Sequence, residues 1–252
     1  MDRNTEVKIL LLDFETSPWV AECYGKIWEP VVMDIKEFSQ ILSVAYRWYG
    51  ETKTHYLGQN EIEGYKKGKL NDKKLLEIFS EVIKQADYIV AHNGDKFDWL
   101  MIKERIMFHR LQPLPEIPSF DTKKLFAQNS NLPSNKLNYA SVFMGNGRKM
   151  EHADNLFSKC KAGDENAWRI NKKYNKRDVD VMYDDFKDIM PYVKLSSKQT
   201  VFSSGVQCKN PLCLSYQVAK SKRSRVKNGW KIQYQCNKCG RYFTSDKIIK
   251  DE

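Results

Sequence analysis

Four acidic residues and one tyrosine stand at positions in this sequence that suit the binding of divalent cations. Asp13 and Glu15 follow a short apolar run and are separated by one residue, so on a strand their side chains would project from the same side. Asp98 follows a glycine-containing turn, and Tyr174 and Asp178 are four residues apart, as on one face of a helix. Mg²⁺ and Mn²⁺ prefer oxygen ligands, which carboxylates from several elements can supply together.

Each of these patterns is common on its own, because acids follow buried strands in many α/β proteins and the helix dipole favours an acid such as Asp98 in a first turn. A tyrosine and an aspartate four residues apart also mean little alone. Their combination predicts phosphodiester hydrolysis, in which two divalent cations about 3.5–4 Å apart stabilise the attacking hydroxide and the leaving oxygen. The Tyr174 phenol would then reach water or phosphate.

Two close pairs of cysteines, Cys208 with Cys213 and Cys236 with Cys239, predict a second metal site near the C-terminus. Spacing of this kind suits four thiolates around one structural Zn²⁺, as in a small zinc ribbon. So few apolar residues surround these pairs that zinc would supply much of the folding free energy. The alternative is four free buried cysteines. The other two, Cys23 and Cys160, have no partner at metal spacing and are expected to be ordinary thiols.

The positive charge of the chain is concentrated around these cysteines. The whole sequence carries 42 basic and 32 acidic residues, whereas the segment from Cys208 to the end carries 11 basic against 3 acidic residues. Cations can neutralise phosphates and aromatic rings can stack on bases, so we predict that this segment contacts nucleic acid. The predicted contacts are Lys220, Lys222, Arg223, Arg225, Lys227, Trp230 and Lys231. Two alternatives remain open, namely that the ribbon docks a protein and that the lysines only keep the chain soluble.

The elements that must position these residues can be read from the apolar pattern. The run 8–12 has the length of a buried strand and would end at Asp13, and residues 40–49 and 53–57 predict a hairpin. A helix capped by Asn71 would lead into a buried strand at 87–91. Another helix would begin near Asp98, after which residues 112–119 form a proline-rich loop.

The remaining elements follow in the same way. A short edge strand would enter Asp121, which we leave outside the catalytic set, and a helix would follow at 123–128. Asp164 is a candidate N-cap for a long amphipathic helix that ends near Pro191. The sequence therefore predicts an α/β domain at 1–195 with a mixed sheet flanked by helices, a linker at 196–207, and a zinc ribbon with a basic tail at 208–252.

Three motifs in this sequence resemble those of the DEDD superfamily of RNase H-like 3′-to-5′ exonucleases. They are Leu11-Leu12-Asp13-Phe14-Glu15-Thr16-Ser17-Pro18, His92-Asn93-Gly94-Asp95-Lys96-Phe97-Asp98 and Tyr174-Asn175-Lys176-Arg177-Asp178-Val179. Tyr174 resembles the tyrosine subclass, related to the proofreading domains of family B polymerases. The stretches 132–137 and 161–164 look like a group of such exonucleases common in phages and bacteria, with a C-terminal cysteine module.

The resemblance implies a role for each matching residue. Asp13 would bridge two Mg²⁺ or Mn²⁺ ions, Glu15 and Asp178 would complete the site of the attacking water, and Asp98 would support the second ion through water. Tyr174 would orient the nucleophile or the scissile phosphate. His92 and Asp95 receive no role.

We therefore expect a 3′-to-5′ exonuclease that acts on single-stranded or frayed DNA, with a replication or recombination protein as a possible partner. The alternatives are an endonuclease or RNA-processing nuclease of the same fold, and a non-catalytic nucleic-acid-binding module. The complete acid set argues against the last alternative, because crowded carboxylates repel one another without metal. No stretch of eighteen apolar residues or signal-like N-terminus occurs, so we expect a protein in the cytoplasm of a bacterium or a phage-infected cell.

Overall fold

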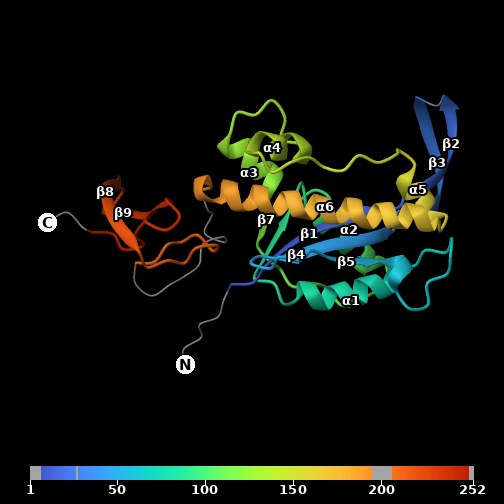
Figure 1. Ribbon diagram of the computed structural model, residues 1–252, viewed down its shortest axis with the longest axis horizontal. Helices are drawn as coiled ribbons and strands as arrows, with labels where there is room; N and C mark the ends of the chain where they lie inside the picture. The colour runs from blue at the N-terminus through green and yellow to red at the C-terminus, as the bar shows by residue number, and fades with distance from the viewer. Residues whose placement is uncertain (1–6, 27, 195–205, 250–252) are drawn as a thin grey trace.

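The computed structural model describes residues 7–26, 28–194 and 206–249 (Figure 1). Its main sheet has the strand order β5-β4-β1-β6-β7. The strands are β1 (Ile9–Thr16), β4 (Ile41–Trp48), β5 (His55–Gly58), β6 (Tyr88–Ala91) and β7 (Ser119–Asp121). Strand β1 pairs antiparallel with β4 and parallel with β6, so the sheet is mixed, as the sequence predicted.

Helices cover both faces of this sheet, as Figure 1 shows. Along β1 successive side chains point to opposite faces, so Ile9 and Leu11 pack under α6 (Glu165–Ile189). Leu10 and Leu12 pack on the other side, against α1 (Lys73–Ile83) and α2 (Asp98–Phe108). Three shorter helices, α3 (Thr122–Asn129), α4 (Leu137–Met144) and α5 (Leu156–Lys161), lie on the α6 side. Short 3₁₀ turns occur at Gln59–Glu61 and Met190–Tyr192. The predicted α/β fold is thus confirmed.

Strand β1 continues beyond the point where the sequence predicted its end. Asp13 was expected at the end of the strand, but pairing with β4 continues through Phe14 and Glu15. That prediction was wrong because the apolar run is not the only buried part of the strand, since Phe14 is also buried. Both acids therefore lie within a central strand, where neighbouring strands restrict their movement.

Some helix signals were read correctly and others not. Asp164 is the N-cap of α6 and accepts a hydrogen bond from the Ala167 backbone N–H at 2.9 Å. The N-cap of α1 is Asp72 rather than Asn71, although the Asn71 side chain still accepts from the Lys73 N–H at 3.1 Å. The sequence missed α4 and α5 entirely. Of the linker predicted at 196–207, residues 196–205 lie outside the described part of the chain.

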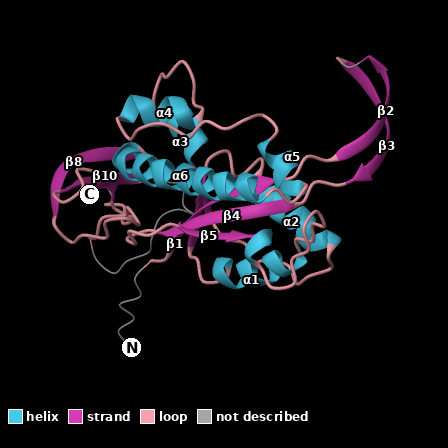
Figure 2. Cartoon of the chain, turned by 45° about the vertical axis from the view of Figure 1, so that its right-hand side comes forward, coloured by secondary structure: helices cyan, strands magenta, loops and turns pink. Residues whose placement is uncertain are grey.

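A hairpin formed by β2 (Val20–Lys26) and β3 (Glu29–Glu37) extends away from the body (Figure 2). The sequence did not predict it. It follows β1 directly, and its base is fixed by Lys161, whose Nζ lies 2.8 Å from a Glu37 carboxylate oxygen. The hairpin is exposed along nearly its whole length, including Tyr24 and Trp28.

A second sheet near the C-terminus has the order β10-β9-β8, with β8 (Val218–Val226), β9 (Gly229–Cys236) and β10 (Tyr242–Thr244). It contacts the main domain through Arg241, which is 6% exposed. The Arg241 guanidinium donates hydrogen bonds to the carbonyls of Met190 (2.9 Å) and Val193, just after α6. In the described residues, no helix is both long and apolar enough to cross a membrane.

Candidate active site

Three of the four predicted acids come together between β1 and α6. Asp13 and Glu15 are on the odd-numbered side of β1, the side that α6 covers, and Asp178 comes from the middle of α6. Each of the three offers a carboxylate oxygen that lies within 4.8 Å of the other two. The fourth acid, Asp98, is not in this group.

Asp98 instead lies close behind β1, at the start of α2. Its Oδ1 accepts a hydrogen bond of 3.0 Å from the backbone N–H of Phe14, the residue between Asp13 and Glu15. Burial raises the pKa of Asp98 to about 7, although hydrogen bonds from the backbone oppose this rise. Asp98 thus positions the strand segment that carries the two other acids, and adds negative charge beside them.

The acids are held in a state that disfavours full ionisation. Burial raises the pKa of Asp13 well above its ordinary value, and the charges of Asp98 and Asp178 raise it further. Burial, followed by the charges of Asp13 and Asp178, does the same to the pKa of Glu15. A bound cation would stabilise the ionised form of carboxylates in this arrangement.

Lys149 is the cation that the structure supplies to this cluster. Its Nζ lies 2.6 Å from Asp178 Oδ2 and 5.2 Å from the centre of the Tyr174 ring. Burial disfavours its charge, but Asp178 and Tyr174 raise the pKa of Lys149 above its ordinary range. The Tyr174 hydroxyl is hydrogen-bonded to both Lys149 and Asp178. The Tyr174 ring meets the His152 ring edge-on, with centroids 4.5 Å apart.

The loop that carries Lys149 and His152 is fixed to α6. Arg177 donates from Nε to the carbonyl of Arg148 at 3.0 Å. Gly147 has a φ of +96°, and a Cβ there would lie 2.5 Å from the Arg177 guanidinium, so glycine permits the close approach. The position of Lys149 is therefore built into the fold.

Asn175 holds Asp13 from the same helix. Its amide nitrogen donates to the Asp13 carbonyl at 3.0 Å and to Asp13 Oδ2 at 2.8 Å. The Asn175 oxygen in turn accepts from the Ser43 hydroxyl at 3.3 Å, and that hydroxyl accepts from Asn171 at 2.8 Å. A line of buried polar groups thus ties α6 to β1 and β4 beside the acids.

Residues 39–184, more than half of the chain, match the RNase_H_2 family, described as RNase_H superfamily. The chain belongs to the RNase_H superfamily. The match contains Asp98, Tyr174 and Asp178 but begins after Asp13 and Glu15, which the fold adds to the same site.

A solved structure with a similar fold is the family B DNA polymerase from the hyperthermophilic archaeon Pyrobaculum calidifontis. It matches 73% of this chain at 13% sequence identity with a TM-score of 0.55. This RNase_H superfamily chain spans only 25% of that polymerase. No curated protein matches the sequence of this chain.

Nucleases with this fold use divalent metal ions, and the residues present fit such ions. Asp178 Oδ1 is buried and has no hydrogen-bond partner, and it belongs to the group of three converging carboxylates. An unpaired buried oxygen is costly unless a cation or donor satisfies it. Because the donors are all carboxylate oxygens, the cluster suits a hard cation such as Mg²⁺ or Mn²⁺.

Other polar residues near the second motif have structural partners, although His92 Nε2 and Asp121 Oδ2 are buried without a hydrogen-bond partner. Asp121 accepts hydrogen bonds from the N–H groups of Lys123 and Lys124 at the start of α3, so it acts as a helix cap. Asp95 pairs with Lys124, whose Nζ lies at 2.6 Å. The His92 Nδ1 lies 2.9 Å from the Thr122 hydroxyl, and burial lowers the pKa of His92 to about 4.

The four clustered cysteines converge as the sequence predicted, with one sulfur from each of Cys208, Cys213, Cys236 and Cys239 within 4.8 Å of the others. Burial raises the pKa of Cys208, whereas the N–H groups of Cys239 and Lys238 overcome burial and lower the pKa of Cys236 to about 7. Four sulfurs in this arrangement are compatible with one tetrahedral Zn²⁺. Cys160 is buried and Cys23 is exposed, and neither belongs to the cluster.

The seven predicted nucleic-acid contacts do not form a single surface. Cross-strand register places Arg225 opposite Trp230 and Arg223 opposite Ile232, on one face of the β8–β9 ribbon. Lys222 and Lys231 alternate with these residues and so lie on the other face. Lys220 is paired with Tyr234 near the start of β8, Lys227 lies in the turn of the ribbon, and the Arg225 guanidinium is 5.0 Å from the Trp230 ring. Tyr234, another aromatic residue of β9, is buried against Phe243.

Sequence reasoning missed Lys149, His152 and Asn175. Asn175 is adjacent to Tyr174 in the third motif, but an asparagine inside a helix gives no signal of its own. Lys149 and His152 come from a loop whose proximity to α6 depends on tertiary packing. A lysine among the 42 basic residues of this chain cannot be singled out by type alone.

Proposed function

We propose that this chain is a 3′-to-5′ exonuclease of the DEDD tyrosine subclass that acts on single-stranded or frayed DNA. The observation that carries the proposal is the convergence of Asp13, Glu15 and Asp178 with Lys149 and Tyr174 at one point between β1 and α6. The polymerase of similar fold gives the proposal its replication context.

Asp13, Glu15 and Asp178 would hold two divalent cations, with Asp98 supporting them from behind β1. When bound, such cations stabilise the attacking hydroxide and the leaving oxygen of a phosphodiester. Asn175 fixes the Asp13 carboxylate, so its orientation is set before substrate arrives.

Tyr174 and Lys149 would act on the substrate itself. The Tyr174 hydroxyl, already oriented by Asp178 and Lys149, would position the nucleophile or the scissile phosphate. The Lys149 ammonium would stabilise the negative charge that develops on the phosphate in the transition state. The charge of Lys149 thus serves the same end as the cations.

The C-terminal segment with the four clustered cysteines would hold one structural Zn²⁺ and bind the strand that is being degraded. Arg241 attaches it to the end of α6, the helix that also carries Tyr174 and Asp178. A ribbon attached in this way would guide a strand toward the site rather than move independently.

The test is degradation of 5′-labelled single-stranded DNA with Mg²⁺ or Mn²⁺ by the wild type and by Asp13→Asn. We expect a ladder that shortens from the 3′ end and a loss of at least a hundredfold in rate in the variant. Glu104→Gln, an exposed acid on α2, is the matched control and should degrade DNA at the wild-type rate.

Two further substrates define the specificity. Circular single-stranded DNA should stay intact, because a strict exonuclease needs an end, and its cleavage would reassign the protein as an endonuclease. A labelled RNA of the same sequence separates DNA degradation from RNA processing. Binding of DNA without cleavage of DNA or RNA under either metal would refute the nuclease proposal.

A further inference from the structure

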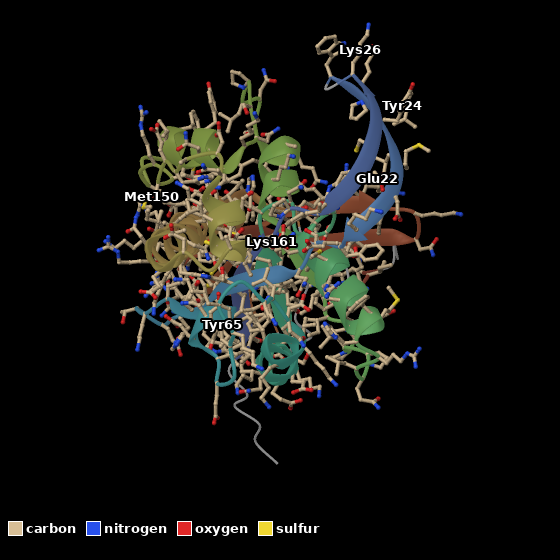
Figure 3. The ribbon with its side chains drawn as sticks, turned by 90° about the vertical axis from the view of Figure 1, so that its right-hand side faces the viewer. Glu22, Tyr24, Lys26, Tyr65, Met150 and Lys161 are labelled. Carbon is tan, nitrogen blue, oxygen red and sulfur yellow. The ribbon has the colours of Figure 1, made fainter. Side chains whose placement is uncertain are left out.

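The loop that carries Lys149 connects α4 to α5 and runs along α6 (Figure 1). In the view of Figure 3, Met150, the next residue of the loop, lies at the edge of the molecule, away from the hairpin residue Tyr24. Among the loop residues 145–155, all of which the structure describes, none is buried. Apolar packing therefore does little to fix this loop, and its position depends on hydrogen bonds to the neighbouring helices.

Asn138, in the first turn of α4, holds the backbone of Lys149 itself. Its Oδ1 accepts a hydrogen bond of 3.1 Å from the Lys149 backbone N–H. Helix α4 is in turn fixed to α6, because the Ser141 hydroxyl donates to the buried carboxylate of Asp185 at 2.6 Å. The backbone of Lys149 is thus connected through Asn138 to a helix that is itself anchored.

Asn146 fixes the loop three residues before Lys149. Its amide nitrogen donates to Asp185 Oδ1 at 2.9 Å and to Asp188 Oδ2 at 3.1 Å, and both carboxylates belong to α6. Burial raises the pKa of Asp185 to about 6, although the hydrogen bonds from Ser141 and Asn146 oppose this rise. Asp185 is therefore ionised above neutral pH, and hydrogen bonds to an ionised acceptor are stronger than those between neutral groups.

The contact between Lys149 and Asp178 is sensitive to the position of this loop. The two groups are 2.6 Å apart, so a backbone shift of about 1 Å would take them beyond normal hydrogen-bond distance. The Lys149 side chain is 29% exposed. A lysine whose backbone had moved could therefore turn its ammonium to water, where that group is well hydrated.

We propose that Asn138 and Asn146 are positioning residues that hold Lys149 in place for catalysis. Both act through the backbone of the loop, Asn138 at Lys149 itself and Asn146 through the carboxylates of α6. The expected effect on rate rests on the proposed nuclease function, in which the Lys149 ammonium stabilises the phosphate in the transition state. The effect on the position of Lys149 does not depend on that function.

The first test measures the position of Lys149 without any nuclease activity. Sulfo-NHS-acetate acetylates accessible amines, and peptide mass spectrometry gives the rate of acetylation of Lys149 in the folded full-length protein without divalent cations. We expect Asn138→Ala and Asn146→Ala to raise this rate about threefold or more, because a lysine released from Asp178 is more exposed. Asn138 is itself exposed, so Asn138→Ala keeps the test valid even if Asn146→Ala does not fold.

The second test measures initial rates of single-stranded DNA degradation with Mg²⁺ or Mn²⁺. Asn138→Ala should lower kcat about tenfold with a smaller change in KM, because the displaced charge acts in the transition state. Asn138→Asp keeps an acceptor oxygen and should recover most of the rate. Gln128→Ala, at an exposed position of α3, is the matched control and should behave as the wild type in both tests. In Lys149→Met, adding Asn138→Ala should lower kcat no further, because the effect passes through the lysine.

Each result decides between positioning and a purely structural role. Acetylation of Lys149 at the wild-type rate in Asn138→Ala would overturn the proposal, whatever the nuclease activity. An equal loss of kcat from Asn138→Ala with and without Lys149 would overturn it too, as would faster acetylation with an unchanged kcat. Faster acetylation in proteins that degrade no nucleic acid would uphold the positioning of Lys149 and refute only the nuclease proposal.

Discussion

The Asp98 carboxyl combines near-complete burial with a hydrogen bond to the strand that carries Asp13 and Glu15. Its raised pKa, about 7, means that ionisation costs more in the folded than in the unfolded chain. The contribution of protonated Asp98 to the free energy of unfolding is fully present below about pH 4, and it is lost as the pH rises through about 7. Ionised Asp98 thus destabilises the metal-free protein at neutral pH.

We therefore predict that Asp98→Asn stabilises the metal-free protein at pH 8 but not at pH 4. The asparagine oxygen can still accept from the Phe14 N–H, while the charge is removed. The gain in unfolding free energy at pH 8 should be at most about 4 kcal/mol, the equivalent of about three pKa units. Urea denaturation at both pH values, without added divalent cations, measures it. Parallel stability curves for wild type and variant would contradict the prediction.

Lys149 should contribute to the rate of phosphodiester cleavage. Lys149→Met should lower kcat by about 10²–10³, as expected for loss of a charge that stabilises the transition state, with a smaller change in KM. Lys149→Arg keeps the charge and should recover part of the rate. Initial rates over a range of single-stranded DNA concentrations separate the two constants. An unchanged kcat in Lys149→Met would leave the lysine with a purely structural role.

The sequence could identify the acids because carboxylates in ordered motifs are rare enough to be recognised together. It could not identify Lys149, which contacts Asp178 across 29 residues of chain. That contact depends on which loops pack against α6, and residue type carries no information about that.

At the scale of elements, the turn between β6 and α2 sets the position of Asp98. A Cβ at Gly94 would lie 2.3 Å from the Ala91 Cβ and 3.6 Å from Asp98 Oδ2. Gly94→Ala should therefore destabilise the protein by about 1–3 kcal/mol through overpacking and displace Asp98, lowering nuclease activity.

The matched control for Gly94→Ala is the double variant Ala91→Gly/Gly94→Ala, which removes the atom that the new methyl group would meet. We expect it to recover much of the lost melting temperature and activity. Thermal denaturation and a DNA degradation assay on the three proteins decide this. If the double variant were as impaired as Gly94→Ala, the contact with Ala91 would not be the cause.

The elements that the sequence predicted are those that bury a regular apolar pattern, such as β1, α1 and the long helix α6. Helix α5 contains only six residues, and α4 buries Ser141 while it exposes Val142 and Phe143, so neither has an apolar face that stands out in the sequence. The β2–β3 hairpin buries almost nothing, so no core requirement marked it. Elements with a regular buried apolar pattern were therefore predicted, whereas α4, α5 and the exposed hairpin were not.

For the whole molecule, α6 connects the parts that would act together. In its middle it carries Tyr174 and Asp178, and beyond its end Arg241 attaches the segment with the four clustered cysteines. A nucleic acid strand that follows this helix would meet both. The basic ribbon is the part whose contribution depends most on ionic strength, because exposed cations act through counterion release.

The two faces of that ribbon should differ in their contribution to DNA binding. Arg223→Gln/Arg225→Gln removes two charges from the face that carries Trp230, and Lys222→Gln/Lys231→Gln removes two from the opposite face. If the strand stacks on Trp230, the arginine pair should lower the slope of log affinity against log salt concentration by about 1.4, at roughly 0.7 per phosphate contact on a single strand. The lysine pair should leave the slope unchanged. Titrations of labelled single-stranded DNA at several salt concentrations, without divalent cations, measure both slopes. Equal changes in the two variants would mean that the ribbon attracts DNA only through its overall charge, and a change confined to the lysine pair would place the strand on the other face.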